Sequence, residues 1–408
     1  MTSNQRIVAI GAGLAAIQLA DSLRQEGFDG DILLIGDEPY KPYQRPPLSK
    51  NFLAGEMSED DLQMRPETFY ASNRIEVGLN KHAQAIDRAT KTVRLSSGEK
   101  IRYDKLAITT GTRARKIPVP GAELKGVLYS RGIDDILQMR EFLDSSEQIA
   151  VVGAGFIGLE TAAVLRKMGK EITVLEMQDR VMPRVVAPLV SEFFQKEHEA
   201  HGVIVRTGVT VAGFEGDKHG RLTAVLLGDG TKIPAQMAVV GIGVIPNSEL
   251  AQEAGLVCDN GICVDEYSRT SDPDIVAAGD VASHPNALLG GRVRLESIHN
   301  ALEQAKAAAA TLCGKQKVYE QYPWFWSDQY DLKLQMVGLS QDYDSIVIRG
   351  DMAERKFSIF YFKGKKLLAV DSVNQSADHK QARRILNGRI AITPEQAGDP
   401  NCDLATLA

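Results

Sequence analysis

Residues 149–158 read IAVVGAGFIG, and residues 7–16 read IVAIGAGLAA. In each copy an apolar, strand-like run leads into glycines in a G-x-G pattern, and a helix-like segment follows. One such pattern alone is a weak signal, because the chain contains 36 glycines. Two copies in the same context predict two βαβ units that each bind a dinucleotide. The alternative for either copy is a glycine turn between strand and helix that binds no ligand.

The small residues of such a unit have separate tasks. The first two glycines allow a tight turn and a close approach of the backbone to a pyrophosphate, and the third position needs a small residue so that helix and strand can pack. Gly158 takes the third position in the second copy, and Ala16 takes it in the first. The helix N-terminus behind the turn favours negative charge, because its N–H groups are free and its dipole is positive there.

Each unit also ends near an acidic residue. The second strands, expected at residues 31–35 and 171–175, are followed by Asp37 in the first copy and by Glu176 in the second. A carboxylate here accepts hydrogen bonds from a ribose 2′-OH and repels a 2′-phosphate. Glu176 therefore favours NADH over NADPH, although Arg180 is near enough in sequence to leave NADPH open.

The remaining chain predicts further strands and a third domain. Two apolar runs, at residues 106–111 and 275–280, end in glycine-containing turns. From Pro323 onward, aromatic residues concentrate in alternating, strand-like runs such as residues 357–361. We therefore expect an α/β fold with two Rossmann-like dinucleotide-binding domains and a C-terminal α+β domain.

Composition excludes several classes of protein. The 408 residues carry 47 Lys+Arg against 53 Asp+Glu, a net charge of -6, so the global charge signature of a nucleic-acid-binding protein is absent. The longest charge-free run, between Lys232 and Glu249, is too short and too polar to span a bilayer core of ~30 Å. The N-terminus shows no signal-peptide pattern. We expect a cytoplasmic protein without a nucleic-acid or membrane partner.

Several segments together resemble a known family. They are RPPLSK at residues 45–50, TTG at 109–111, AGD at 278–280, ALEQA at 301–305 and PWFWSDQY at 323–330. With the two glycine patterns they are similar to the FAD-dependent, NADH-using ferredoxin reductases of the glutathione-reductase-like fold, over about residues 6–400. The chain departs from that family at Ala16, and at Lys306, where the family has arginine; Lys306 bears on the choice of partner.

The resemblance implies a domain organisation and a set of ligand contacts. It places an FAD-binding domain at 1–112 and 242–322, an NADH-binding domain at 113–241 and an interface domain at 323–408. For FAD it implies contacts from Gly11, Gly13, Ala15, Asp37, Lys50, Ala83, Arg131, Asp280 and the backbone N–H of Ile298. For NADH it implies Gly153, Gly155, Gly158 and Glu176, with Glu160 near the nicotinamide. Ala83 and Ile298 are equally compatible with plain core packing.

The expected reaction needs a group that accepts two electrons together and releases them one at a time. NADH gives up a two-electron hydride, whereas a [2Fe–2S] ferredoxin accepts single electrons, and a flavin supplies the conversion. We hypothesise that Lys50 and Glu160 form an ion pair beside the flavin, with the ammonium stabilising negative charge and the carboxylate orienting the nicotinamide amide. The alternative is that Lys50 caps a surface loop and Glu160 makes a helix-surface pair. No metal site is expected.

Cysteine usage argues against a protein thiol in the electron path. The four cysteines, which start only at Cys258, are too few and too scattered for a disulfide scaffold or a zinc site. Disulfide reductases of the glutathione-reductase-like fold place a cysteine pair against the flavin. Residues 1–257 of this chain contain no cysteine. Cys258 and Cys263 have C-x4-C spacing, but Asp259-Asn260-Gly261 between them predicts a hairpin turn. Electrons are therefore expected to leave the flavin directly.

An outgoing electron needs a docking surface for the acceptor. Ferredoxins are usually acidic, so a locally basic patch would steer their approach. The candidates are Arg65, Lys306, Lys380, Arg383 and Arg384, and Trp326 is expected to shield the flavin or to shorten the electron path. The alternatives are a solvated helix face for the basic residues and a core role for Trp326.

The expected partner is a [2Fe–2S] ferredoxin that serves a cytochrome P-450 monooxygenase. Three alternatives stay open: the reductase component of an aromatic-ring dioxygenase, a rubredoxin reductase, and a signalling flavoprotein similar to apoptosis-inducing factor. A monomer or a weak homodimer is expected.

Overall fold

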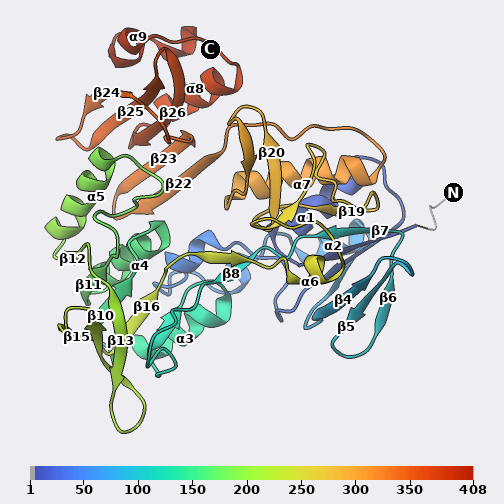
Figure 1. Cartoon of the computed structure of the whole chain (residues 1–408), viewed down its shortest axis with the longest axis horizontal. Coiled ribbons are helices and arrows are strands. Elements are labelled where there is room, and N and C mark those ends of the chain that lie inside the picture. Colours follow the sequence, from blue (N-terminus) through green and yellow to red (C-terminus); the bar gives the residue numbers. More distant parts are fainter. Residues whose placement is uncertain (1–4, 408) are drawn as a thin grey trace. The chain divides into compact units, whose positions relative to one another are not determined.

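The computed structural model describes residues 5–407 (Figure 1). The chain divides into two compact units. The first comprises the chain up to Gln44, Leu62–Arg113 and Ile245–Phe325, and the second comprises Arg45–Asp61, Ala114–Val244 and the chain from Trp326 onward. Two short strands, β8 (Thr112–Ala114) and β17 (Val244–Pro246), lie where the chain passes between units. The second unit therefore contains both Lys50 and the second glycine pattern.

The first compact unit contains the first of the two predicted βαβ motifs. This motif consists of β1 (Arg6–Ile10), α1 (Leu14–Gln25) and β2 (Asp31–Ile35). The parallel sheet has the order β19-β7-β1-β2-β3, with β3 at Ile75–Gly78, β7 at Lys105–Ile108 and β19 at Ile275–Ala277. Its strands are almost continuously apolar because both faces are buried. The carboxyl ends of β1, β7 and β19 therefore bring three sequence motifs to one edge.

Both faces of this sheet are covered within the unit. On one face α1 and α7 (Ile298–Leu312) pack together in one apolar cluster with the strands. On the other face the cluster includes residues of an antiparallel sheet formed by β4 (Ala83–Asp87), β5 (Thr92–Leu95) and β6 (Lys100–Arg102). The unit also contains α2 (Glu67–Ser72), α6 (Glu249–Glu253), β18 (Ile262–Cys263), β20 (Ala282–Asn286) and β21 (Gly291–Val293).

The second unit repeats the βαβ arrangement with β10 (Gln148–Val152), α4 (Phe156–Lys167) and β11 (Glu171–Leu175). Its parallel sheet has the order β12-β11-β10-β16-β9, with β9 at Val127–Tyr129, β12 at Ile204–Arg206 and β16 at Met237–Val240. An antiparallel sheet packs on it through a shared apolar cluster and contains β13 (Val211–Gly216), β14 (Leu222–Leu227) and β15 (Lys232–Pro234). The helices α3 (Ile133–Leu143) and α5 (Pro188–Ala200) complete this part.

The C-terminal segment forms the predicted α+β domain. Its five-stranded sheet has the order β22-β23-β26-β25-β24, and Figure 1 shows it in orange and red with α8 and α9. Phe357, Phe360 and Phe362 of β25 are fully buried, so the aromatic run builds this core. The bounds are Trp324–Gln329, Leu332–Gly338, Ser345–Asp351, Lys356–Lys363 and Lys366–Val373 for β22 to β26, Ser376–Asn387 for α8 and Pro394–Gly398 for α9.

Within residues 5–407, no helix has both the length and the apolar character that crossing a membrane requires. The same residues contain no group of three or more His, Cys, Asp and Glu side chains arranged to hold a metal ion.

Candidate active site

The first glycine loop leaves space only where a ligand would need it. Gly11 has φ +104°, and a methyl group on it would lie 2.3 Å from the carbonyl oxygen of Thr109, so only glycine fits. A methyl group on Gly13 would meet nothing within 4 Å. No side chain caps the N-terminus of α1, where Gly13 is the N-cap residue. The helix N–H groups are therefore available to an anionic group, which fits the pyrophosphate of a dinucleotide.

The AGD turn lies against this loop. A methyl group on Gly279 would lie 3.1 Å from Cβ of Ala15, so both positions must stay small. The backbone N–H of Gly279 donates to Oε1 of Gln304, and the Thr112 hydroxyl donates to the carboxylate of Asp280 at 3.3 Å. The fold thus brings Ala15 and Asp280 together although 265 residues separate them in the sequence.

The second glycine loop has the same design in the second unit. A methyl group on Gly153, at φ +102°, would lie 2.4 Å from the carbonyl oxygen of Gly241, and one on Gly158 would lie 2.1 Å from the carbonyl oxygen of Gly153. Gly155, the N-cap residue of α4, again faces open space and no side chain caps the helix. This loop therefore fits a second pyrophosphate.

Lys50 and Glu160 meet inside the second unit. The Nζ atom of Lys50 lies 3.3 Å from Oε1 of Glu160, and the two side chains are only 17% and 8% exposed. Lys50 follows a 3-10 helix, η1 (Pro46–Ser49), and Glu160 lies on the second turn of α4. The hypothesised ion pair between Lys50 and Glu160 is present, and its carboxylate lies on the helix that begins at the second glycine loop.

Three polar residues around this pair were not predicted. The Ser49 hydroxyl donates to Oε2 of Glu160 at 2.9 Å, and the Ser327 hydroxyl donates to Oε1 at 2.8 Å. Asp328 binds the Lys50 ammonium at 3.0 Å. Burial raises the pKa of the Glu160 carboxyl, and Lys50 and the two hydroxyls act in the opposite direction.

The comparison with known proteins decides the family. Residues 5–305 match the family described as Pyridine nucleotide-disulphide oxidoreductase, and residues 324–408 match the one described as Reductase C-terminal. The chain belongs to the pyridine nucleotide-disulphide oxidoreductases.

Its relatives within this family include ferredoxin reductases and rubredoxin reductases. Putidaredoxin reductase CamA of Pseudomonas putida is 42% identical over 411 residues, which cover 100% of this chain and 97% of the relative. The crystal structure of the ferredoxin reductase for the CYP199A2 system from Rhodopseudomonas palustris matches with a TM-score of 0.96 and 44% identity, over 99% of this chain and 100% of that one. The covalent putidaredoxin reductase–putidaredoxin complex matches with a TM-score of 0.96 and 42% identity, over 99% and 98%.

The chain is therefore an FAD-dependent ferredoxin reductase that oxidises a nicotinamide nucleotide. The predicted family, fold, enzyme class and FAD cofactor are confirmed. The roles of individual residues stay predictions.

In this ferredoxin reductase, Glu176 is fixed by the backbone. Its Oε2 atom accepts from the N–H of Ala154 at 2.8 Å, and its Oε1 atom accepts from the N–H of Gln178 at 2.9 Å. Arg180 donates instead to Ser191 and to the carbonyl oxygens of Pro183 and Val186. The carboxylate therefore stands at the glycine loop, while the guanidinium is held by its own loop.

Glu176→Gln is expected to lower the ratio of kcat/KM for NADH to kcat/KM for NADPH by about tenfold, because the amide still accepts a hydrogen bond but no longer repels a 2′-phosphate (about 1.4 kcal/mol). Steady-state ferricyanide reduction with each nucleotide measures this. Glu171→Gln, at the other end of β11, is the matched control. An unchanged ratio in the Glu176 variant would exclude the discriminating role.

The remaining predicted FAD contacts lie in different places. In the first unit, Asp37 is exposed just after β2, Ala83 begins β4 and is half-buried against the core, and Ile298 is the first residue of α7, behind its cap Ser297. In the second unit, the Arg131 backbone N–H donates to Asp135, in front of α3.

The predicted docking residues also fall in both units. In the first, Lys306 binds Glu303 at 2.6 Å and Arg65 binds Asp21 at 3.3 Å. In the second, Lys380 and Arg384 are exposed on α8, and Arg383 is half-buried. His379, which precedes Lys380 on α8, is buried.

The predicted hairpin between Cys258 and Cys263 is present. Asn260 and Gly261 both have positive φ, and Cys258 pairs with Ile262 in an antiparallel bridge. Both thiols are free. The two cysteines are therefore not directly opposite each other across the hairpin, because Cys258 pairs with the residue before Cys263.

Proposed function

We propose that this chain is an NADH:ferredoxin oxidoreductase that passes electrons one at a time to a [2Fe–2S] ferredoxin serving a cytochrome P-450 monooxygenase. The observation that carries the proposal is the buried Lys50–Glu160 ion pair, whose carboxylate lies on the helix of the second glycine loop. FAD, when bound, supplies the conversion of a hydride into single electrons.

The two charged side chains would have distinct tasks. The Lys50 ammonium lies between the carboxylates of Glu160 and Asp328, so a dihydropyridine and a flavin that meet here would find a fixed positive charge. Such preorganised charge stabilises negative charge that develops during hydride transfer. Glu160, which accepts from one hydroxyl on each oxygen, would accept a further hydrogen bond from the nicotinamide amide.

NADH would also cover exposed apolar surface in the second unit. Ile157 at the start of α4, Met177 after Glu176 and Val185 in the next loop are large apolar side chains that are exposed. The loop that carries the last two runs beside the glycine loop, where the N–H of Met182 donates to the carbonyl oxygen of Ala154. Covering these side chains would add apolar contacts to NADH binding.

We assign FAD binding to residues 1–112 and 242–322, NADH binding to 113–241 and the acceptor interface to 323–408. One glycine loop lies in each compact unit, which supports the separation of FAD binding from NADH binding. The compact units differ from this assignment in two places, because residues 45–61 and the chain from Trp326 onward belong to the second unit.

The function is tested with purified protein reconstituted with FAD. Anaerobic NADH is expected to bleach the flavin absorbance, and cytochrome c reduction is expected to depend on an added [2Fe–2S] ferredoxin. A flavin that stays oxidised, or equally fast cytochrome c reduction without ferredoxin, would contradict the proposal. The terminal enzyme is identified in two parallel assays. One measures turnover of a cytochrome P-450 and the other turnover of a Rieske-type dioxygenase, and each enzyme is supplied with its own ferredoxin.

Charge reversal on α8 is expected to weaken ferredoxin reduction about tenfold at low salt, because Arg383 and Arg384 would steer an acidic partner. The Arg383→Glu/Arg384→Glu variant should keep its NADH–ferricyanide activity. Lys363→Glu/Lys365→Glu, on the hairpin between β25 and β26, makes the same change of charge as a control. Equal loss of both activities in the α8 variant would mean that these arginines support folding.

A further inference from the structure

A line of buried polar side chains leads away from Glu160 through the second unit. Gln329 donates from Nε2 to the Ser327 hydroxyl oxygen at 3.1 Å, and its Oε1 atom lies 2.9 Å from Nε2 of His198. Nδ1 of His198 lies 3.2 Å from the Tyr330 hydroxyl. Ser327, Gln329 and His198 are each fully buried.

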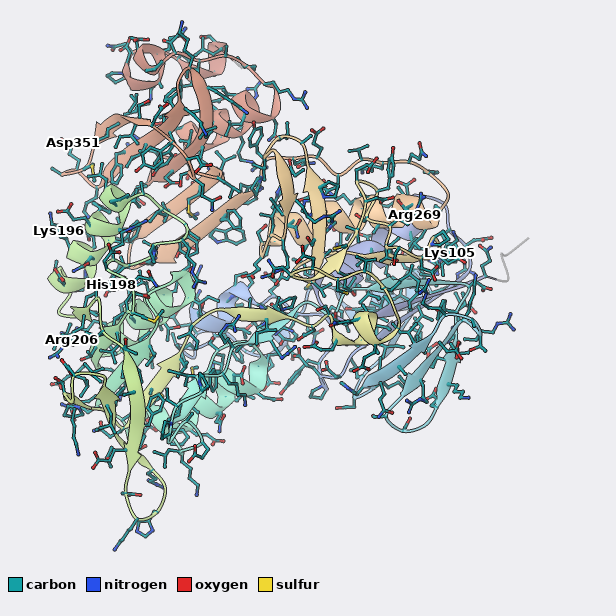
Figure 2. All side chains as sticks on the ribbon, in the orientation of Figure 1. Lys105, Lys196, His198, Arg206, Arg269 and Asp351 are labelled. Carbon is teal, nitrogen blue, oxygen red and sulfur yellow. The ribbon has the colours of Figure 1, made fainter. Side chains whose placement is uncertain are left out.

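Two elements supply these side chains. Ser327 and Gln329 alternate on one face of β22, and His198 lies in the last turn of α5, where Figure 2 labels it. On the opposite face of β22, Trp326 and Asp328 are half-buried. The strand therefore presents Asp328 to Lys50 and connects Glu160 to α5 through its other face.

The hydrogen bonds can run in only one direction while Glu160 is charged. A carboxylate only accepts, so the Ser327 hydroxyl must donate to it and must accept from Gln329. The Gln329 oxygen then faces His198 and can only accept, which requires the proton on Nε2 of His198. The Nδ1 atom of a neutral imidazole accepts, so Tyr330 donates.

The surroundings agree with a neutral His198. Burial lowers its pKa to about 4, the Gln329 hydrogen bond opposes this, and His201 lowers it further. The ring of His201 stacks on Tyr330, with the ring centroids 3.7 Å apart. Tyr330 is also held through its carbonyl oxygen, which accepts from Lys167. Both ends of the line are therefore held by further contacts.

We propose that Ser327, Gln329 and His198 are positioning residues for hydride transfer: they form a directional hydrogen-bonded relay that holds Glu160 as an oriented carboxylate. The relay rests on the proposed role of Glu160. It acts through a single atom, Oε1, while Ser49 holds Oε2. The charged groups that face Glu160 are Lys50 and, behind it, Asp328.

The test follows the ionisation of Glu160 directly. Full-length, FAD-loaded protein labelled with ¹³C at the glutamate carboxyls is titrated by NMR without NADH, and Glu160→Gln identifies the resonance. Ser327→Ala is expected to raise the pKa of Glu160 by about one pH unit, because the charged form loses a hydrogen bond. Gln329→Leu should raise it in the same direction by less. Ser358→Ala, another fully buried serine in the same sheet, should leave it unchanged.

His198 provides a second readout. ¹⁵N shifts of labelled histidine are expected to show a neutral ring with its proton on Nε2 at pH 7. His198→Gln keeps a donor towards Gln329 and should preserve the pKa of Glu160, whereas His198→Leu should raise it. The relay is overturned if Gln329→Leu and His198→Leu leave this pKa at the wild-type value, or if His198 carries its proton on Nδ1.

Kinetics separate this relay from the proposed function. A raised Glu160 pKa means that the anion is lost at higher pH, so the acid limb of the rate of anaerobic flavin reduction should move upward in Ser327→Ala and Gln329→Leu, with equal rates at pH 9. If Glu160→Gln reduces its flavin as fast as the wild type, the proposed role of Glu160 fails, while the NMR titration still decides the relay.

Discussion

Lys50→Met is expected to slow the reduction of bound FAD by NADH about 100-fold, which is about 2.7 kcal/mol in activation free energy. The substitution removes the ammonium that lies between Glu160 and Asp328 and keeps most of the side-chain volume. It also leaves the buried Glu160 without its cationic partner, which disfavours the carboxylate. Anaerobic stopped-flow absorbance with saturating NADH measures the rate.

Lys170→Met is the matched control for this experiment. Lys170 is also half-buried in the second unit, but its ammonium donates to the carbonyl oxygen of Leu143 instead of to a carboxylate. Each rate is expressed per bound flavin, so that loss of FAD or of folded protein in Lys50→Met is not mistaken for slow hydride transfer. A Lys50 variant that reduces its flavin at the wild-type rate would exclude the ion pair from hydride transfer.

Gly155→Val is expected to raise the dissociation constant for NADH about 100-fold, again about 2.7 kcal/mol, without loss of FAD. The residue has no positive φ and faces open space, so the protein itself accommodates a side chain there. The same space lies at the free N-terminus of α4, where a pyrophosphate would bind, so the added methyl groups would exclude the ligand.

The outcome separates a binding loop from a packing turn. Gly228→Val, at another turn of the second unit, should change neither NADH binding nor flavin content, because a Cβ there would make only ordinary van der Waals contact with Thr210, at 3.7 Å. Gly158→Ala should instead destabilise the fold, because its methyl group would overlap the carbonyl oxygen of Gly153. NADH binding by equilibrium titration and thermal unfolding together measure these effects. Unchanged NADH affinity in Gly155→Val would mean that the loop binds no nucleotide.

The local pattern predicted the frame of both units. The expected strands at residues 31–35 and 171–175 are β2 and β11 to the residue, because apolar runs between glycines and acids leave little choice of bounds. The two glycine loops were located for the same reason. These features depend on residues that are close together in the sequence, so a local pattern is enough to predict them.

The surroundings of Glu160 could not be predicted in this way. Lys50 and Glu160 were paired by resemblance, whereas Ser49, Ser327 and Asp328 were not singled out. Ser327 lies 167 residues from Glu160, and no local period indicates which distant polar side chains share a buried site. The burial of His379 could have been predicted. His379 lies on the buried face of α8 with Ala382, Ile385 and Leu386, and helical periodicity indicates that face.

The second unit is assembled from three separate stretches of chain, and this has a consequence for its synthesis. Lys50 and Asp328, which form one of its ion pairs, are 278 positions apart in the sequence. At roughly 5–20 residues per second, a ribosome needs on the order of tens of seconds to deliver the last of them. Nascent chains that end before β22 therefore lack Ser327 and Asp328, so the hydrogen bonds and ion pairs around Lys50 and Glu160 are completed only late in synthesis.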